Sequence, residues 1–252
     1  MQSDLRLPAR GYRAQKGAYD VAFKLAKAND KNAQKGYAMC AGLKLPAATQ
    51  ALWPPGGDFG STRAEGRKTM TDEMIVRHCA PTLAGIKTGS MFTCPCASRQ
   101  MLTDELRQLN RRLVPRGLCV LPLRYLNRNA LIYVFRPNAL RRDLSDQAAA
   151  ALLQRHGYRN GPAERCICHL IGRFQAGGEF PHEVGLFLGY PPEDVRGFID
   201  NRAAGHKMAG RWKVYGDEAA ARKTFDRYKR CTQAYCLQWK KGTPIERLTV
   251  AG

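Results

Sequence analysis

The spacing of apolar residues after Met70 predicts a chain built mainly of helices. Apolar residues recur at intervals of three and four in segments that end at glycine or proline, which is typical of amphipathic helices packed against a core. Several segments carry acidic residues in the first turn and basic residues in the last, the order that the helix dipole favours. The predicted helices cover residues 71–79, 102–113, 145–156, 162–175, 181–189, 191–199 and 217–240.

Two segments rich in Val, Ile, Leu and Tyr predict a β-hairpin. They are Leu118–Tyr125 and Ala130–Arg136, joined by residues 126–129. Arg211–Tyr215, the tryptophan strand, follows a glycine-bounded loop, and residues 86–92 are a candidate further strand. The pattern therefore predicts an α+β fold, with about seven helices around a small, mainly antiparallel sheet formed by the hairpin and the tryptophan strand. We expect the last residues, 242–252, to form a short tail.

The first 69 residues differ in composition from the rest of the chain. Gly, Pro, Lys and Ala are scattered through them, and the one helical pattern, Ala18–Ala28, is weak. Residues 65–68 can be encoded by purine runs that resemble a ribosome-binding site, a few codons before Met70. We hypothesise that translation starts at Met70, with a basic disordered extension as the alternative. Peptides from before Met70 in the native protein would rule the hypothesis out. Residues 70–252 are expected to form a single globular domain.

Composition narrows the class of protein. The chain has 252 residues, and 44% of them are apolar, enough for a globular core. The sequence contains no apolar run long enough for a transmembrane helix and no apolar core of a secretion signal near its start, so no membrane association is expected. The nine cysteines are then better explained as reduced thiols than as disulfides. These features predict a cytoplasmic protein.

The formal net charge of +20 raises the question of a nucleic-acid partner. Residues 1–69 hold 12 basic and 5 acidic side chains, so +13 of the charge belongs to the remainder. Most of that excess is arginine spread along predicted helices, which favours a solvated surface of mixed charge. A nucleic-acid-binding module that uses the arginine-rich hairpin and the last helix is the alternative.

The densest group of chemically functional side chains lies between Glu179 and Asp217. Pro181 suits the first position of a helix, so His182 and Glu183 would lie in a first turn. The helix dipole there disfavours an imidazolium and favours a neutral imidazole, which can accept a proton. We therefore take His182 and Glu183 as the candidate catalytic residues for acid and base chemistry. The alternative is that both residues only cap the helix.

Five further residues are candidates for ligand binding. Four come from the same region, and Lys87 comes from the segment GIKTG, which resembles a phosphate loop only loosely. The hypothesis is a small cytoplasmic enzyme or ligand-binding protein that acts on a small molecule. No motif identifies a cofactor, a reaction type or an oligomeric state. The ligand-binding candidates are Tyr190, Lys213, Tyr215, Asp217 and Lys87.

A third hypothesis is a thiol-based metal or redox protein. The cysteine pairs in the chain are C-x-C, which is not the C-x-x-C spacing of zinc knuckles, so no residue is proposed as a metal ligand. Cys79 lies at the negative end of its predicted helix, which raises a thiol pKa. The cysteines on which this hypothesis depends are Cys79, Cys94, Cys96, Cys231 and Cys236.

Six blocks of sequence resemble a bacterial family known as domain of unknown function 3793. They are HCAPTLAGIKTGSMF, LNRRLVPRGL, ALIYVFRP, EFPHEVGLFLGYPPEDVRGFIDN, WKVYGD and ERLTVA, in the family's own order. The resemblance covers about residues 74–251 and implies no activity, because the family has none assigned. Members often have cysteines around the tryptophan strand, where this chain has Met208, Ala209 and Arg211.

Overall fold

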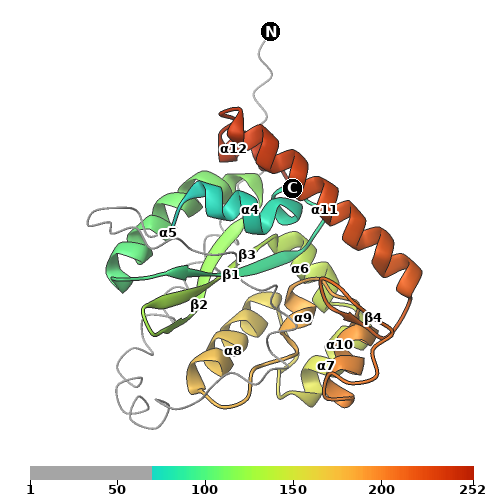
Figure 1. Cartoon of the computed structure of the whole chain (residues 1–252). Coiled ribbons are helices and arrows are strands. Elements are labelled where there is room, and N and C mark those ends of the chain that lie inside the picture. Colours follow the sequence, from blue (N-terminus) through green and yellow to red (C-terminus); the bar gives the residue numbers. More distant parts are fainter. Residues whose placement is uncertain (1–69) are drawn as a thin grey trace.

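The computed structural model describes residues 70–252 and has an α+β architecture (Figure 1). The start-site hypothesis for residues 1–69 lies outside the described residues. Within these residues there are nine α-helices, of which seven have eight residues or more, and five strands in two antiparallel sheets. The predicted fold class is therefore confirmed. The elements are α4 (Asp72–Leu83), β1 (Gly89–Pro95), α5 (Arg99–Leu113), the 3-10 helix η1 (Val114–Arg116), β2 (Cys119–Leu126), β3 (Asn129–Phe135), α6 (Pro137–Leu144), α7 (Gln147–Arg155), α8 (Ala163–Ala176), α9 (Val184–Phe187), α10 (Pro192–Asp200), β4 (Met208–Ala209), β5 (Lys213–Val214), α11 (Glu218–Lys240) and α12 (Ile245–Leu248).

The predicted hairpin forms the centre of the larger sheet. Its strand order is β1-β3-β2, and β3 pairs antiparallel with both neighbours. The turn between β2 and β3 has two residues, Asn127 with φ of 48° and Arg128 with φ of 59°. Two successive positive φ values are typical of a type I′ turn, which matches the twist of the paired strands. The predicted third strand is β1, shifted by three residues from the expected start.

The larger sheet is buried on both faces. Along β3, Ile132 and Val134 pack with α4, α5 and α12, whereas Tyr133 and Phe135 pack with α6 to α9. Successive side chains of a strand point to opposite faces, so the two cores alternate residue by residue. Figure 1 shows the sheet between these two groups of helices. Burial on both faces explains why the strands are almost continuously apolar.

The tryptophan strand does not join this sheet, contrary to expectation. It is reduced to β5, which pairs with β4 in a separate two-stranded sheet, Met208 opposite Val214. Trp212 instead packs with the start of α11, where the Phe225 ring lies edge-on at 4.5 Å between ring centroids. A Cβ on Gly210 would come within 2.2 Å of the Phe225 ring. Packing on α11, and not pairing with the hairpin, therefore positions the two-stranded ribbon of β4 and β5 (the β4–β5 ribbon).

Two predicted helix boundaries are wrong. Helix α4 continues through Pro81 to Leu83, because Pro81 removes one hydrogen bond only and the amide of Ala84 still donates to the carbonyl of Ala80 at 2.8 Å. Helix α5 begins at Arg99, capped by the Ser98 side chain, whereas Thr103 is buried inside the helix.

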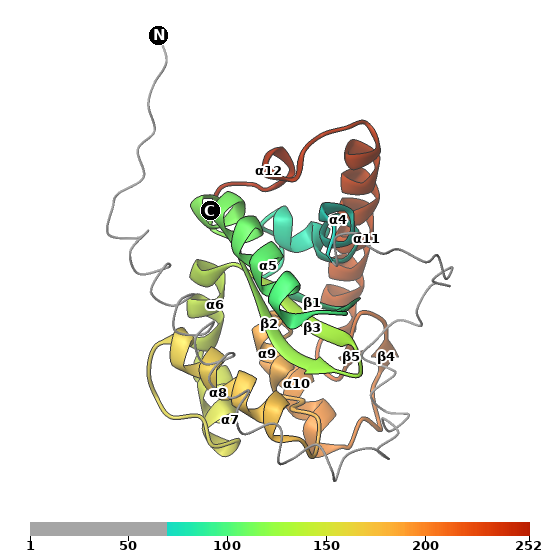
Figure 2. The same ribbon diagram turned by 90° about the vertical axis from the view of Figure 1, so that its left-hand side faces the viewer.

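The last residues are not a tail. They form α12, where Ile245 is fully buried, and the amide of Val250 donates to the carbonyl of Leu83 at 3.0 Å. Figure 2 shows the chain returning from the end of α11 across α4 toward α5. No helix in the described range has both the length and the apolar character that crossing a membrane requires.

Candidate functional site

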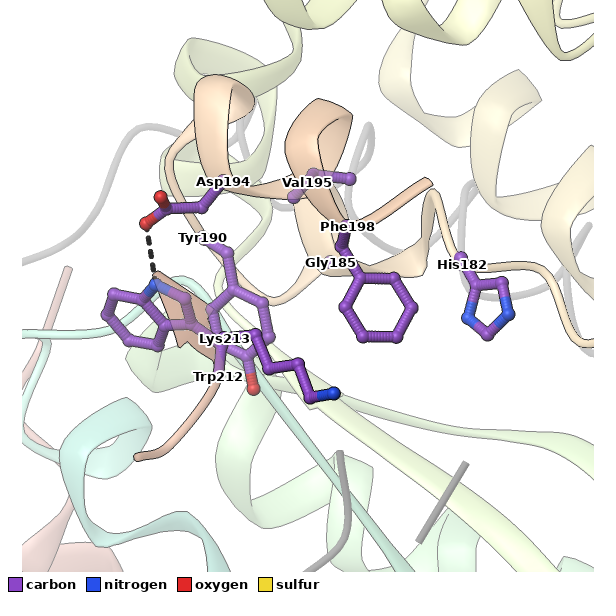
Figure 3. Close-up of a pocket in the computed structure, with 8 residues that line it drawn as sticks. All are labelled: His182, Gly185, Tyr190, Asp194, Val195, Phe198, Trp212 and Lys213. Atoms are coloured by element: carbon purple, nitrogen blue, oxygen red, sulfur yellow. Dashed lines mark hydrogen bonds between the residues drawn. The ribbon is translucent and has the colours of Figure 1, made fainter. Parts of the chain in front are cut away.

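A small pocket lies where α9, α10 and the β4–β5 ribbon meet (Figure 3). Its cavity volume is about 20 Å³, measured by the positions that a water centre can take. That is room for about one water molecule or one functional group of a ligand. The lining residues are His182, Gly185, Tyr190, Asp194, Val195, Phe198, Trp212 and Lys213.

Close packing of α9 on α10 sets the floor of the pocket. Pro181 and the turn after it lead into α9, a single helical turn that ends at the Gly189 and Tyr190 break. Gly185 allows the contact with α10, since a Cβ there would come within 2.7 Å of Val195. The next helix begins at Pro192, with Glu193 and Asp194 in its first turn.

Asp194 holds the ribbon against α10, and sequence reasoning missed this role. Its side chain is 3% exposed and accepts three hydrogen bonds: from Trp212 Nε1 at 2.7 Å, from the Tyr215 amide at 2.7 Å and from the Gly216 amide at 2.8 Å. An acid in a first helical turn is already explained by the dipole, so the sequence gives no further signal for it. Only the tertiary structure shows that this carboxylate is buried and that both of its oxygens accept hydrogen bonds.

His182 lies in the turn before α9 and is half-buried. Its ring contacts Phe198, with 4.9 Å between centroids, and Phe180, with 5.5 Å. Its buried Nδ1 has no hydrogen-bond partner among the described residues. Burial lowers the pKa of His182, and the carboxylates of Glu179 and Glu183 oppose that shift only in part. The neutral imidazole agrees with the sequence-based expectation, but its main cause is desolvation.

Lys213 brings a cation to the same pocket. Its Nζ donates to the carbonyl of Ala203 at 2.7 Å and lies 5.9 Å from the centroid of the Phe198 ring. In Figure 3 the side chain extends from the ribbon toward the Phe198 ring, which His182 also contacts. The structure thus brings His182 and Lys213 together around one aromatic ring.

The other catalytic candidate, Glu183, lies outside the pocket lining. Its side chain is 1% exposed, and its Oε1 accepts a hydrogen bond from the Tyr158 hydroxyl at 3.0 Å and pairs with Arg173 Nε at 3.2 Å. Burial and the negative charge of Glu183 raise the pKa of Tyr158 above its ordinary value. Glu183 therefore joins α8 to the start of α9, and the structure does not place its carboxylate beside His182 in the pocket.

Two ligand-binding candidates have structural contacts of their own. Asp217 caps α11, since its Oδ1 accepts from the Ala220 amide at 3.0 Å. The Tyr215 ring packs on Gly197 of α10, where an added Cβ would come within 2.4 Å of it. The Tyr215 hydroxyl is buried without a hydrogen-bond partner among the described residues, and the ring lies 6.5 Å from that of His206. Neither Asp217 nor Tyr215 lines the pocket.

Tyr190 connects the pocket to Lys87. The ring of Tyr190 stacks on Trp212 with 4.7 Å between centroids, and Lys87 Nζ lies 5.2 Å from the Tyr190 ring. Lys87 also donates a hydrogen bond to the carbonyl of Gly89. Burial lowers the pKa of Lys87 to about 7, an effect that Cys79 opposes and Arg211 reinforces. Lys87 therefore lies behind the aromatic wall and does not line the pocket itself.

The cysteines of the described part are all free thiols. Burial raises the pKa of Cys79, Cys94 and Cys119 to about 12, so these three are protonated at neutral pH. Within residues 70–252, no group of three or more His, Cys, Asp or Glu side chains is arranged to hold a metal ion. The described geometry does not favour the thiol-based hypothesis.

The described residues form an α+β fold with a compact aromatic pocket. Residues 75–249 match the model of a family described as protein of unknown function (DUF3793), and the chain belongs to this family. The resemblance seen in the sequence is thereby confirmed. Neither the curated proteins nor the solved structures contain a match to the chain.

Proposed function

We propose that the protein binds a small molecule with an acidic group, which its pocket holds between His182 and Lys213. The observation that carries the proposal is the buried Nδ1 of His182, which has no hydrogen-bond partner among the described residues and belongs to a side chain that lines the same small pocket as Lys213. A buried polar atom without a partner costs about 1–3 kcal/mol, so a ligand oxygen that hydrogen-bonds to it would recover that energy.

The two side chains have complementary roles in this proposal. A neutral imidazole has one N–H donor, and in the tautomer that carries the proton on Nδ1, His182 donates a hydrogen bond to an oxygen of the anionic group. Lys213 has three donors and uses one on the carbonyl of Ala203, which leaves others for an anionic oxygen. Phe198 contacts both residues and lowers the local dielectric, which strengthens the attraction between Lys213 and an anion.

The dimensions of the pocket limit the ligand. A cavity of about 20 Å³ takes one functional group, such as a carboxylate, and excludes a whole drug-sized molecule. The remainder of the ligand would extend out of the cavity beside Tyr190 and Trp212, which line the same pocket. If the protein is an enzyme, His182 is its general base.

The experiment is a melting-temperature screen against aromatic and aliphatic carboxylates and phosphates near neutral pH. A ligand that binds the native state raises the melting temperature, and the rise grows with the logarithm of the ligand concentration over its Kd. We expect His182→Ala and Lys213→Met each to abolish the shift. The matched control is Lys207→Met, because Lys207 Nζ also donates to a backbone carbonyl, that of Gly216 at 2.8 Å, but does not line the pocket.

The proposal fails if the whole screen leaves the wild-type melting temperature unchanged, or if ligand shifts survive in the His182→Ala variant. We further propose that the protein acts in the bacterial cytoplasm, which the free thiols of the described residues support. Recovery of the native protein in a membrane or secreted fraction would contradict this location.

A further inference from the structure

The outward face of α11 is a long, strongly basic surface. The helix has 23 residues, which corresponds to a length of about 35 Å. Figures 1 and 2 show it along the outer edge of the molecule, with α4 on its inner side. This surface is far larger than the pocket and does not depend on it.

The apolar side of α11 is already covered by the protein itself. Ala221 and Tyr228 are buried against Trp212 and its neighbours, and Tyr235 and Trp239 pack against the core formed with α4. No apolar stripe is left for insertion into a lipid bilayer. What α11 offers to a partner is its polar side.

Seven basic side chains, all exposed, occupy that side, against two acidic residues, Glu218 and Asp226. At 100° per residue, the seven fall within about 160° of the helix circumference. Residues 218–241 thus carry a net charge of +5. The basic residues are Arg222, Lys223, Arg227, Lys229, Arg230, Lys240 and Lys241.

The helix dipole does not account for this arrangement. It favours cations in the last turn, where Lys240 lies, but it falls off within one turn of each end and so does not explain the basic residues from Arg222 to Arg230. Like charges also repel at spacings of three and four, as in Lys223, Arg227 and Arg230. The ion pair that the described residues form on this face joins Arg222 and Glu218 at 2.8 Å. The concentration of positive charge therefore lowers the stability of the helix, and a polyanionic partner would remove that penalty.

We propose that this face of α11 binds duplex DNA by entering its major groove. A helix is about 10–12 Å wide, which fits a groove about 12 Å wide, and its length is close to one turn of the duplex. Basic residues lie at both ends of the face, where they would contact phosphates on the two sides of the groove. Between them Gln233, Ala234 and Leu237 are exposed and uncharged, and Leu237 is 59% exposed. These three would face the base edges.

The test measures binding of the full chain to a labelled DNA duplex of about two helical turns at several salt concentrations. The variant combines Lys223→Gln, Arg230→Gln and Lys241→Gln, which lie on one stripe of α11 and its C-cap. The control combines Arg111→Gln, Arg159→Gln and Arg165→Gln, which are exposed outside α11 and remove the same net charge. All six side chains are exposed, so both variants should melt like the wild type.

We expect the wild type to bind the duplex and to lose affinity steeply between about 50 and 200 mM salt. Each phosphate contact removed should lower the salt dependence by about one, so the α11 variant should lose about three and bind at least about tenfold more weakly. The control should bind as the wild type does. The proposal is overturned if the wild type does not bind at low salt, or if the control loses as much affinity as the α11 variant. It is also overturned if single strands, duplex RNA or vesicles with anionic lipid bind as tightly as duplex DNA.

Discussion

At the scale of single residues, the buried carboxylate of Asp194 determines where the pocket walls lie. It accepts hydrogen bonds from the Trp212 indole and from two amides of the chain after β5. The β4–β5 ribbon carries Lys213 on one wall of the pocket, and α10 forms another wall. The hydrogen bonds of Asp194 therefore hold these two walls together.

We predict that Asp194→Ala lowers the free energy of unfolding by about 3 kcal/mol, because it leaves three donors without their charged acceptor in a buried setting. Chemical denaturation measures the loss, and the near-UV circular dichroism of Trp212 should change with it. Glu193→Ala is the matched control, since Glu193 is exposed on the same helical turn. Equal losses in the two variants would contradict the role given to Asp194.

The half-buried imidazole of His182 predicts a pH dependence of stability. Its pKa is lowered in the folded protein from an ordinary value of 6.5, mainly by burial. The unfolded chain therefore binds the proton first as the pH falls, and the folded state loses stability below about pH 6.5. We expect His182→Gln to reduce this loss, measured by urea denaturation at pH values above and below 6.5. Parallel pH profiles for the wild type and the variant would disprove the assignment.

At the scale of elements, glycines decide how closely the pocket helices approach their neighbours. In α10, Gly197 lies against the Tyr215 ring, whereas Gly172 in α8 has open space where its Cβ would be. Both glycines are inside helices, so the intrinsic gain from alanine is the same. The effects of alanine at the two positions should therefore differ only through the packing around the added Cβ.

We predict opposite effects for the two alanine substitutions. Gly172→Ala should stabilise the protein by about 0.5–1 kcal/mol through the lower entropy of its unfolded chain. Gly197→Ala should destabilise it by about 1–3 kcal/mol, because the new Cβ would lie 2.4 Å from the ring and force the ribbon away from α10. Thermal denaturation of both variants tests the pair, and a stabilising Gly197→Ala would show that the ribbon is not held against α10.

At the scale of the whole molecule, the C-terminal residues close the core around α4. Arg136 at the end of β3 donates to the carbonyls of Thr82 and Leu83 at the end of α4, both at 2.6 Å, and to that of Val250 at 2.8 Å. The last residues are thus tied both to α4 and to the larger sheet. Their packing makes them part of the domain.

We predict that Ile245→Ala costs about 2–4 kcal/mol of stability, since the side chain is fully buried and its removal leaves a cavity. Val250→Ala is the control, because Val250 is 50% exposed and its truncation should change the stability by less than about 0.5 kcal/mol. Denaturant titration at constant pH distinguishes the two. A loss at Ile245 no larger than at Val250 would restore the interpretation of this segment as a tail.

The sequence by itself determined the fold class, the hairpin, the main helices and the family, because these depend on local periodicity and on contiguous motifs. Leu118–Tyr125 and Ala130–Arg136 pair across a two-residue turn, which is a short-range event. The sequence also made His182, Tyr190 and Lys213 candidate site residues, since they belong to one dense stretch of functional side chains. Their common pocket is a local consequence of two helices followed by a ribbon.

Only the tertiary structure decided the partners of buried polar groups and the packing of short elements. It assigned Asp194 to the ribbon and Glu183 to Tyr158 and Arg173, since burial depends on residues distant in sequence. It also separated β5 from the larger sheet and brought α12 into the core. A strand of two residues and a helix of four have too few local interactions to specify their own position, so long-range packing determines where they lie.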